Sequence, residues 1–453
     1  MPDIVIAILG VLFVFGIAIN IHEFGHFIVG KMLGMRIDAY SFFGIGKMIW
    51  KFRRGNTDYG IAMFPIGAYV KFYGDEGTSA LEGGSSTSEN VPREEMFEFR
   101  PRWQKFLVML GGPLMNIILA LAIPFTVAWM YGVPANLAPI VGYVKPAGAA
   151  EKAGLKVGDR IVNFEGVENP AWERIQDDAL LIPEKEVPII VERDGQRISL
   201  KITPTKVTEK GQSAGMLDLA PDMGSEPVVV GSLESGMPAA ESGLQRGDWI
   251  TSVNGKVIRN SQEMKTIVGE TKDQPITLSI TRNNERKEIT TRAVQKGEDW
   301  RIGIAFDTSA ITTREPVGIV GAFSEAVSQN VRILRLTAKA LGQVGTGERS
   351  ARDSVQGPIG IVQTISSMAL TVGFSGLLFL LGLISLNLGV MNLLPIPMLD
   401  GGQIVLLGVE KILSWFGKPL SMALKEKINL TGFAILILLM IFTTFNDISR
   451  FFR

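Results

Sequence analysis

Four long runs without a charged residue constrain this chain of 453 residues more than any other feature of its sequence. A helix needs about 20 mainly apolar residues to cross the hydrocarbon core of a bilayer. Buried helices of soluble proteins seldom contain uncharged runs of this length. We therefore predict a polytopic α-helical membrane protein with four spans, which we place within 4–21, 106–131, 370–394 and 428–446.

The only two histidines of the chain, His22 and His26, follow directly on the first run. Residues i and i+4 of a helix lie on one face, so both imidazoles can reach one metal ion. Zinc binds imidazole nitrogen, and a catalytic zinc site keeps one coordination position open for water. Glu23 follows the first histidine, where its carboxylate can take a proton from that water. The spacing predicts a catalytic zinc site with Glu23 as general base and acid.

A third protein ligand has to be a carboxylate, because the chain has no cysteine and no further histidine. Asp400 is the only charged residue within 354–409. An aspartate at the centre of a membrane helix costs about 2.5–3.5 kcal/mol, which metal coordination would offset. Pro395 and Pro397 cannot continue a regular helix, so the backbone is expected to unwind there. We predict that Asp400 completes a site for one zinc ion per chain; capping a new helix is a second role compatible with the first.

Charge sets the expected orientation of the spans. Lys+Arg and Asp+Glu are both 45, so net charge gives no argument for a nucleic-acid partner. The loop 31–105 is rich in Lys and Arg, and the loop between the third and fourth spans also carries lysines. By the positive-inside rule both loops face the cytoplasm. Both termini and the segment 132–353 are then expected outside.

That outer segment contains an internal repeat. A Gly-Leu-x-x-Gly-Asp-x-Ile pattern begins at Gly154 and again at Gly243, an offset of 89 residues. Two copies at this spacing predict duplicated α/β domains more than a solenoid. The pattern resembles PDZ domains in the permuted order of bacterial proteases, which bind an extended peptide as an added strand. The resemblance places the peptide groove along the first strand of each copy, at Ile140, Val141 and Gly142 and at Val229, Val230 and Gly231. Peptide binding and simple obstruction of access both remain open for these domains.

Two motifs in combination resemble the site-2 protease family of intramembrane zinc metalloproteases. One is the His-Glu-x-x-His motif of the first span, and the other is N-x-x-P-x-P-x-L-D-G-G over 392–402. The segments 112–116 (GPLMN) and 357–361 (GPIGI) add to the resemblance, which covers almost the whole chain.

The resemblance implies further roles for particular residues. Asn387 and Asn392 would hydrogen-bond the substrate backbone, although asparagines also join helices within membrane bundles. The segment 60–71 would be a membrane-dipping β-hairpin that pairs with extended substrate, and its β-rich composition favours a hairpin independently. A glycine-bearing loop at 42–46 would lie close to the active site, with an ordinary turn as the alternative. The substrate-contact candidates are Asn387, Asn392, Phe64, Ala68, Tyr69, Gly44 and Gly46.

The resemblance also implies a location and a substrate. The protein would be a multi-pass protein of the bacterial inner membrane, with the PDZ-like domains in the periplasm and cleavage towards the cytoplasmic side. Its substrate would be a single-span membrane protein, such as an anti-sigma factor already trimmed by an upstream site-1 protease, or a signal-peptide remnant, in stress-response regulated intramembrane proteolysis. The chain is expected to consist of eight segments. They are 1–34 (first span), 35–105 (cytoplasmic loop with the hairpin and a flexible linker at 74–95), 106–131 (second span), 135–210 and 222–308 (PDZ-like domains), 309–369 (amphipathic connector), 370–403 (third span) and 428–446 (fourth span).

Two other functions are alternatives to a protease. A metal-ion transporter would use the histidines and Asp400 for ion passage, but such transporters usually carry repeats within the membrane portion, and none is visible in this sequence. A membrane-anchored PDZ scaffold would leave the histidine motif and Asp400 without a purpose.

Overall fold

The computed structural model describes residues 3–64, 67–74, 91–134, 137–209, 212–222, 228–234, 236–296, 299–306, 314–350, 352, 355–417 and 420–450. The chain divides into two compact units. One comprises Met1–Tyr131, Val317–Ala338 and Gln343–Arg453, and the other comprises Gly132–Pro316 and Lys339–Gly342. Most of the expected linker at 74–95 lies outside the described residues.

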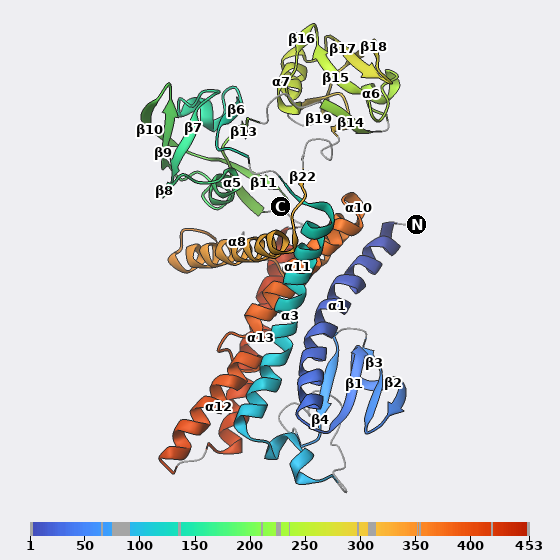
Figure 1. Ribbon diagram of the computed structural model, residues 1–453, viewed down its shortest axis with the longest axis vertical. Helices are drawn as coiled ribbons and strands as arrows, with labels where there is room; N and C mark the ends of the chain where they lie inside the picture. The colour runs from blue at the N-terminus through green and yellow to red at the C-terminus, as the bar shows by residue number, and fades with distance from the viewer. Residues whose placement is uncertain are drawn as a thin grey trace. The chain divides into compact units, whose positions relative to one another are not determined.

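The first unit contains the four expected spans (Figure 1). Four helices of the described chain are long and apolar enough to cross a membrane, which confirms the number predicted from the uncharged runs. They are α1 (Asp3–Met32), α3 (Arg102–Tyr131), α11 (Phe374–Asn392) and α13 (Met422–Arg450).

Glycines bring α1 and α3 into backbone contact. A Cβ atom at Gly25 would lie 2.1 Å from the carbonyl oxygen of Gly111, and one at Gly111 would lie 2.6 Å from the carbonyl oxygen of Gly25. Small residues are the usual means by which membrane helices approach this closely, because lipid offers no hydrophobic driving force between them. The contact places the histidine face of α1 directly against α3.

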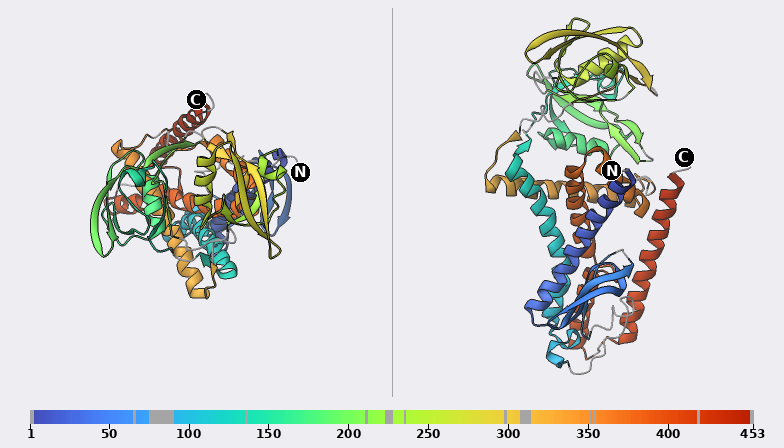
Figure 2. Two further views of the ribbon diagram at one scale, coloured as in Figure 1. Left: turned by 90° about the horizontal axis from the view of Figure 1, so that it is seen from above. Right: turned by 90° about the vertical axis from the view of Figure 1, so that its right-hand side faces the viewer.

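A four-stranded sheet follows α1 in the same unit. Its strands are β1 (Ile37–Phe43), β2 (Ile45–Arg54), β3 (Thr57–Phe64) and β4 (Tyr69–Phe72), in the order β2-β3-β1-β4. Strands β1 and β3 are parallel, whereas β4 pairs antiparallel with the other edge of β1. The sheet packs beside α1 (Figure 2). Two short 3-10 turns, η1 (Arg93–Glu95) and η2 (Phe97–Phe99), precede α3.

The prediction of a β-hairpin at 60–71 is wrong, because the two strands in this segment do not pair with each other. Strands β3 and β4 are consecutive in sequence but do not pair, because β1 lies between them. The hairpin of neighbouring strands is β2–β3, which turns at Gly55 in a left-handed conformation. Strand β4 is instead an edge strand of the sheet.

Two further helices, α8 (Ile319–Thr346) and α10 (Pro358–Thr371), form most of the segment expected as an amphipathic connector. The side-chain amide of Asn330 on α8 donates to the carbonyl of Ala120 on α3 over 3.1 Å. The carboxylate of Asp447 on α13 accepts the backbone N–H groups of Gly357 and Gly360, over 3.0 and 2.8 Å, at the start of α10.

The third span is shorter than expected. Helix α11 ends at Asn392, and 393–399 is irregular before α12 (Asp400–Trp415) begins. The expected span at 370–403 therefore combines the end of α10, the whole of α11, the irregular segment and the first turn of α12. The prolines break the helix as predicted, and Asp400 begins the next one.

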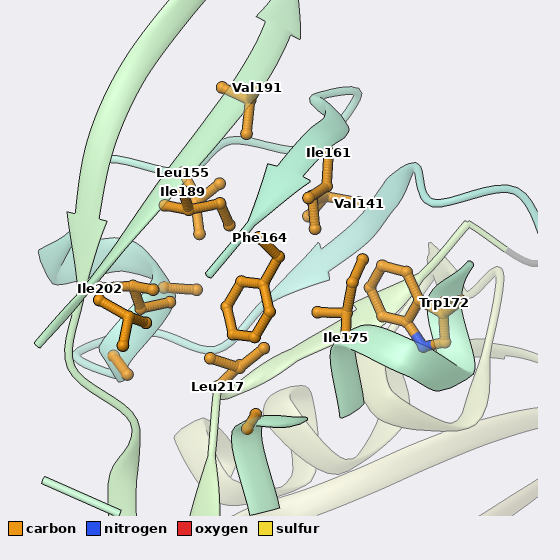
Figure 3. Close-up of a cluster of buried hydrophobic side chains, with 14 of the residues drawn as sticks. Val141, Leu155, Ile161, Phe164, Trp172, Ile175, Ile189, Val191, Ile202 and Leu217 are labelled. Carbon is orange, nitrogen blue, oxygen red and sulfur yellow. The ribbon is translucent and has the colours of Figure 1, made fainter. Parts of the chain in front are cut away.

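The second unit holds two similar α/β domains, which we call the first repeat domain (137–222) and the second repeat domain (228–306). The first has a core around Phe164, Trp172 and Ile189, each at most 1% exposed (Figure 3). It extends beyond the expected end at 210, because β13 pairs with the first strand, β6. Its elements are β6 (Val141–Val144), α4 (Ala149–Lys152), β7 (Arg160–Phe164), β8 (Val167–Glu168), α5 (Trp172–Leu180), β9 (Val187–Arg193), β10 (Gln196–Ile202), β11 (Thr205–Glu209), β12 (Gln212–Met216) and β13 (Leu219–Pro221).

The second repeat domain has its own core, centred on the fully buried Ile250, Leu278 and Ile280. A short pair of strands, β5 (Val133–Pro134) and β22 (Arg314–Glu315), joins the two ends of the unit. The elements of the domain are β14 (Val228–Leu233), α6 (Pro238–Glu241), β15 (Trp249–Val253), β16 (Lys256–Val257), α7 (Ser261–Thr271), β17 (Pro275–Arg282), β18 (Glu285–Arg292), β19 (Val294–Lys296), β20 (Asp299–Arg301) and β21 (Ile304–Phe306).

The repeated Gly-Asp turn has the same function in both domains. Asp159 accepts two hydrogen bonds from Arg193 and one from the backbone N–H of Lys156. Arg193 also donates to the carbonyl of Gly154, so one ion pair fixes both ends of the turn. The same bonds recur at the offset positions, with Arg282 on Asp248 and on the Gly243 carbonyl. Burial raises the pKa of Asp159, but the arginine and the backbone N–H outweigh it and hold that pKa below its usual range.

The strands expected to form the peptide grooves have no free edge. Val141 is hydrogen-bonded to the Gly158–Asp159 turn on one side, and its strand pairs with β13 on the other. Val229 and Val230 lie in β14, which pairs with both β15 and β21. The groove assignment to Ile140, Val141, Gly142, Val229, Val230 and Gly231 is therefore wrong, because strand addition requires an unpaired edge. Among the described strands, β13 and β21 occupy the sheet edges next to these positions.

Candidate metal centre

Three predicted ligands converge in the first unit. The Nε2 atoms of His22 and His26 lie 3.3 Å apart. Asp400 Oδ2 lies 3.2 Å from the Nε2 atom of His22, and the other carboxylate oxygen, Oδ1, lies 3.5 Å from the Nε2 atom of His26. Within the described part of the chain these residues form the one His/Asp/Glu group whose donor atoms could hold a metal ion.

These distances match the requirements of zinc. Zinc binds nitrogen and carboxylate oxygen at about 2.0–2.2 Å in tetrahedral sites, so two ligand atoms are separated by about 3.3 Å. The three observed separations lie within 0.2 Å of that value. If both Nε2 atoms are unprotonated, their lone pairs and the carboxylate repel one another, and a cation bound between them would remove that repulsion. Three protein ligands also leave the fourth position open, as a catalytic site requires.

The start of α12 delivers Asp400 to this cluster. The preceding irregular segment includes Met398 with a φ of 78°, a left-handed conformation that redirects the chain. Gly401 and Gly402 then pack against the backbone of the same segment, where added Cβ atoms would lie 2.3 Å from the Leu393 carbonyl oxygen and 2.1 Å from that of Ile396. Larger residues are excluded at both positions, which accounts for the Asp-Gly-Gly sequence.

Glu23 lies on α1 beside the ligands and interacts electrostatically with His22, His26 and Asp400. The backbone amide of Val70 in β4 faces its carboxylate. Nearby, the Tyr40 hydroxyl donates to the carbonyl of Asn20 over 3.3 Å. Burial, reinforced by the negative charge of Glu23, raises the pKa of Tyr40 above its usual range, so the hydroxyl stays protonated. Strand β4 and the metal cluster are therefore neighbours.

The predicted substrate-contact residues fall into four groups. Asn392 is at the site, with its amide nitrogen 3.3 Å from His22 Nε2. Asn387 donates to Leu383 within its own helix instead. Ala68 directly precedes β4 and Tyr69 is the first residue of that strand, and both side chains are buried. The remaining residues line the β1–β2 turn and its surroundings: Gly44 and Gly46 have positive φ values, the Tyr69 hydroxyl donates to Gly46, and the Phe64 side chain is exposed.

Sequence reasoning missed two contacts on the outer side of the histidines. The Val108 carbonyl lies 2.7 Å from His26 Nδ1, and the Asn116 amide nitrogen lies 3.3 Å from His22 Nδ1. A backbone carbonyl leaves no signal in a sequence. Asn116 does, because it is the only amide side chain within the second run up to residue 131. Such residues in membrane helices usually have a specific partner.

Comparisons with known proteins match the chain from the first span to the fourth. The model of peptidase family M50 matches residues 10–439. Protease RseP of Yersinia pestis is 29% identical over 457 residues, which cover 96% of each chain. Regulator of sigma-E protease RseP of Salmonella typhimurium is 28% identical, again with 96% of each chain covered. A Neisseria meningitidis relative, provisionally named a zinc metalloprotease, is 30% identical over 98% of this chain and 99% of its own.

Among solved structures, the PDZ domain of an SdrC-like protein from Listeria monocytogenes covers 19% of this chain and 94% of its own, with 22% identity and a TM-score of 0.18. The match to peptidase family M50 spans nearly the whole sequence, including both segments that supply the histidines and Asp400. The chain is therefore a member of peptidase family M50, of the site-2 protease type to which RseP belongs.

Proposed function

We propose that this protein is an intramembrane zinc metalloprotease that cleaves transmembrane segments of single-span membrane proteins. The observation that carries the proposal is the convergence of His22, His26 and Asp400 at zinc-ligand distances, beside Glu23. Two of these ligands and Glu23 lie on a helix that is long and apolar enough to cross a membrane. The site combines a set of metal ligands with a base on a helix that could cross a membrane, and hydrolysis of a membrane-embedded peptide bond would use all three.

The residues around the cluster have distinct tasks. His22, His26 and Asp400 would hold a zinc ion, which would supply a Lewis acid to polarise the scissile carbonyl and to lower the pKa of water. Glu23 takes the proton of the attacking water and delivers it to the leaving amine. The Val70 amide, which faces the Glu23 carboxylate, would help to orient it for both transfers.

Strand β4 is the element best suited to hold the substrate. Tyr73, the residue after the end of β4, donates its backbone N–H to the Arg36 carbonyl over 3.1 Å and so fixes that end of the strand. Backbone groups alternate in direction along a strand, so the N–H of Lys71 and Tyr69 also face β1, whereas Val70 and Ala68 face away. An unwound substrate segment added at this edge would satisfy backbone groups that lipid cannot. Asn392 would hold the substrate from the metal side.

Asn387 and Phe64 contribute less to this arrangement. The Asn387 amide is already bonded to its own helix, and Phe64 ends β3, two strands away from β4 in the sheet. We keep Gly44, Gly46 and Tyr69 as supports of the β1–β2 turn.

The substrates we propose are an anti-sigma factor already trimmed by an upstream site-1 protease, and signal-peptide remnants. The names of the relatives, regulator of sigma-E protease, point to the first class. The protein would reside in a bacterial inner membrane with both termini and the repeat domains in the periplasm. The catalytic residues follow the apolar run of α1, so the cut would fall towards the cytoplasmic side.

A Glu23→Gln variant tests the proposal. Membranes from cells with the wild-type protein should contain cut transmembrane peptides, found by mass spectrometry, that are absent with Glu23→Gln. Both purified proteins should hold one zinc per chain, because the glutamate is not a ligand. Equal cleavage by the variant would remove Glu23 from the mechanism. The transporter would be favoured by two results together. Proteoliposomes with the wild-type protein would show zinc flux but no cleavage, and Glu23→Gln would leave that flux undiminished.

A further inference from the structure

Helix α3 contacts the two histidines on the side away from the cluster. His26 Nδ1 lies 2.7 Å from the backbone carbonyl oxygen of Val108. His22 Nδ1 lies 3.3 Å from the side-chain amide of Asn116, eight positions further along the same helix. Each Nε2 faces Asp400. The two imidazoles are therefore held in the same way, with one ring nitrogen to the metal side and the other to α3.

Metal binding fixes which ring nitrogen carries hydrogen. A neutral imidazole that coordinates through Nε2 has its hydrogen on Nδ1, and that N–H needs an acceptor. The Val108 carbonyl accepts it for His26. For His22, an amide nitrogen at 3.3 Å would place two donors against each other. The oxygen and nitrogen of an asparagine amide are assigned by choice, so rotating the amide by half a turn is the physical solution.

The surroundings of Asn116 allow that rotation. Its side chain is completely buried, and its Oδ1 atom has no hydrogen-bond partner among the described residues. Turned round, Oδ1 accepts from His22 Nδ1, and the unpartnered position passes to the amide nitrogen. In either orientation of the Asn116 amide one of its two polar atoms has no partner among the described residues. The hydrogen on His22 Nδ1 therefore decides between the orientations, because only the oxygen can accept it.

The backbone carbonyl of Asn116 has a partner of its own, separate from the contact between its side chain and His22. The Ser385 hydroxyl on α11 donates to the Asn116 carbonyl over 2.9 Å. A Cβ at the nearby Gly112 would lie 2.4 Å from His26 Nε2, so α3 is pressed against the ligands. The Gly112 carbonyl also faces the His22 ring and is the only competing acceptor that the described contacts of this ring reveal.

We propose that Asn116 is a positioning residue that accepts the Nδ1 hydrogen of His22 and so presents Nε2 to the zinc ion. The inference rests on the zinc centre proposed above. Outer partners of this kind typically change metal affinity by about 10–100-fold, which sets the size of the expected effect.

Zinc affinity of the full-length protein in detergent tests this role without any substrate. The affinity is measured by competition with a chromophoric chelator, for the wild type and for Asn116→Leu, Asn116→Ala, Asn116→Asp and Ser385→Ala. We expect Asn116→Leu and Asn116→Ala to bind zinc about 10–100-fold more weakly. Asn116→Asp keeps an acceptor at the same place and should restore affinity to within a few-fold. Ser385→Ala removes a neighbouring buried hydrogen bond without touching His22, and should bind as the wild type does.

The outcomes distinguish a failure of the proposed zinc site from a failure of the role proposed for Asn116. A wild-type protein that binds no zinc contradicts the proposed function itself. A wild type that binds zinc, with Asn116→Leu and Asn116→Ala equal to it, overturns only the role of Asn116 and assigns the hydrogen to the Gly112 carbonyl. Equal weakening in Asn116→Asp and Ser385→Ala would show a general packing effect and would also overturn it. Cobalt(II) substitution gives a second readout that does not depend on Asn116→Leu, should that variant not fold. The visible spectrum of the cobalt protein should differ from that of the wild type in Asn116→Ala, and should be unchanged in Asn116→Asp and Ser385→Ala.

Discussion

At the scale of single residues, the metal centre follows from the shortage of alternatives. The chain has two histidines and no cysteine, so a zinc site that uses both histidines needs a carboxylate as its third protein ligand. The structure brings Asp400 to both imidazoles, as the chemistry of the donor set predicted. Asn116 could not be predicted in the same way, because a lone amide in an apolar run is compatible with several partners, and only its distance to His22 selects one.

Removal of a ligand should therefore abolish tight zinc binding. We expect His22→Ala and Asp400→Ala to lose at least most of the one zinc per chain, measured by elemental analysis of purified protein. Glu23→Gln is the matched control and should retain the metal, since Glu23 lies beside the ligands without being one. A full equivalent of tightly bound zinc in His22→Ala would show that the site lies elsewhere.

The Asp159–Arg193 pair predicts how the first repeat domain responds to acid. The pKa of Asp159 is lowered in the folded protein, so its ion pair stabilises the fold above the ordinary aspartate pKa of about 3.9. That stabilisation is lost as the pH falls through the lowered value. Arg193→Met removes the partner and should make acid unfolding of this domain begin at a higher pH. Hydrogen exchange followed by mass spectrometry measures each domain separately, and the second repeat domain, with Arg282 intact, serves as the internal control.

At the scale of elements, short-range reading of the sequence found the strands but not their partners. The residues at 60–71 have strand-forming composition, and both β3 and β4 exist. Their hairpin was mispredicted because consecutive strands usually pair, whereas here β1 runs parallel to β3 and takes the place beside β4. The groove strands of the repeat domains failed for a related reason: a repeat offset identifies equivalent strands but not which edge is free.

The edge of β4 carries a prediction of its own. Ala68→Pro removes an outward-facing N–H donor and should lower cleavage without releasing zinc. Tyr69→Pro removes an N–H that faces β1 and should disturb the sheet itself. Ile49→Pro on the opposite edge strand, β2, is the control and should leave cleavage close to wild type. Normal cleavage by a folded, zinc-loaded Ala68→Pro protein would exclude backbone pairing at this edge.

Pairing through the backbone also predicts broad specificity. A substrate span has to unwind before it can add as a strand, so Gly or Pro near the cut should accelerate cleavage. A substrate stiffened with leucines over the same region should be cut more slowly. Equal rates for the two, measured on purified protein in detergent, would argue against an unwinding step.

The Asp447 contact joins α13 to the start of α10. Its carboxylate accepts two backbone N–H groups and is only 3% exposed. Asp447→Ala leaves both donors buried without their partner, which should lower the free energy of unfolding by about 1–3 kcal/mol. Thermal unfolding in detergent measures the change. Ser449→Ala, which removes only a local hydrogen bond within α13, is the matched control, and an equal effect of the two would remove the special role of Asp447.

At the scale of the whole molecule, the two units suggest separate tasks. The metal centre lies entirely within the unit of membrane helices, and the repeat domains form the other unit. We expect the repeat domains to act as a size filter that admits a substrate only after its bulky outer part has been trimmed. Deletion of 140–308 should then permit cleavage of an untrimmed substrate, measured by immunoblotting of tagged substrate in cells. Dependence on trimming that persists after the deletion would count against a filter.

The separation of the ligands along the chain has a consequence for biosynthesis. His22 and His26 lie on α1, which is synthesised long before α12, the helix that Asp400 begins. A nascent chain cannot close the ring of donors until α12 has been made, so we expect a copy that stops before Asp400 to lack the metal site. Newly inserted helices near the translating ribosome would then meet no complete site until synthesis has passed that residue.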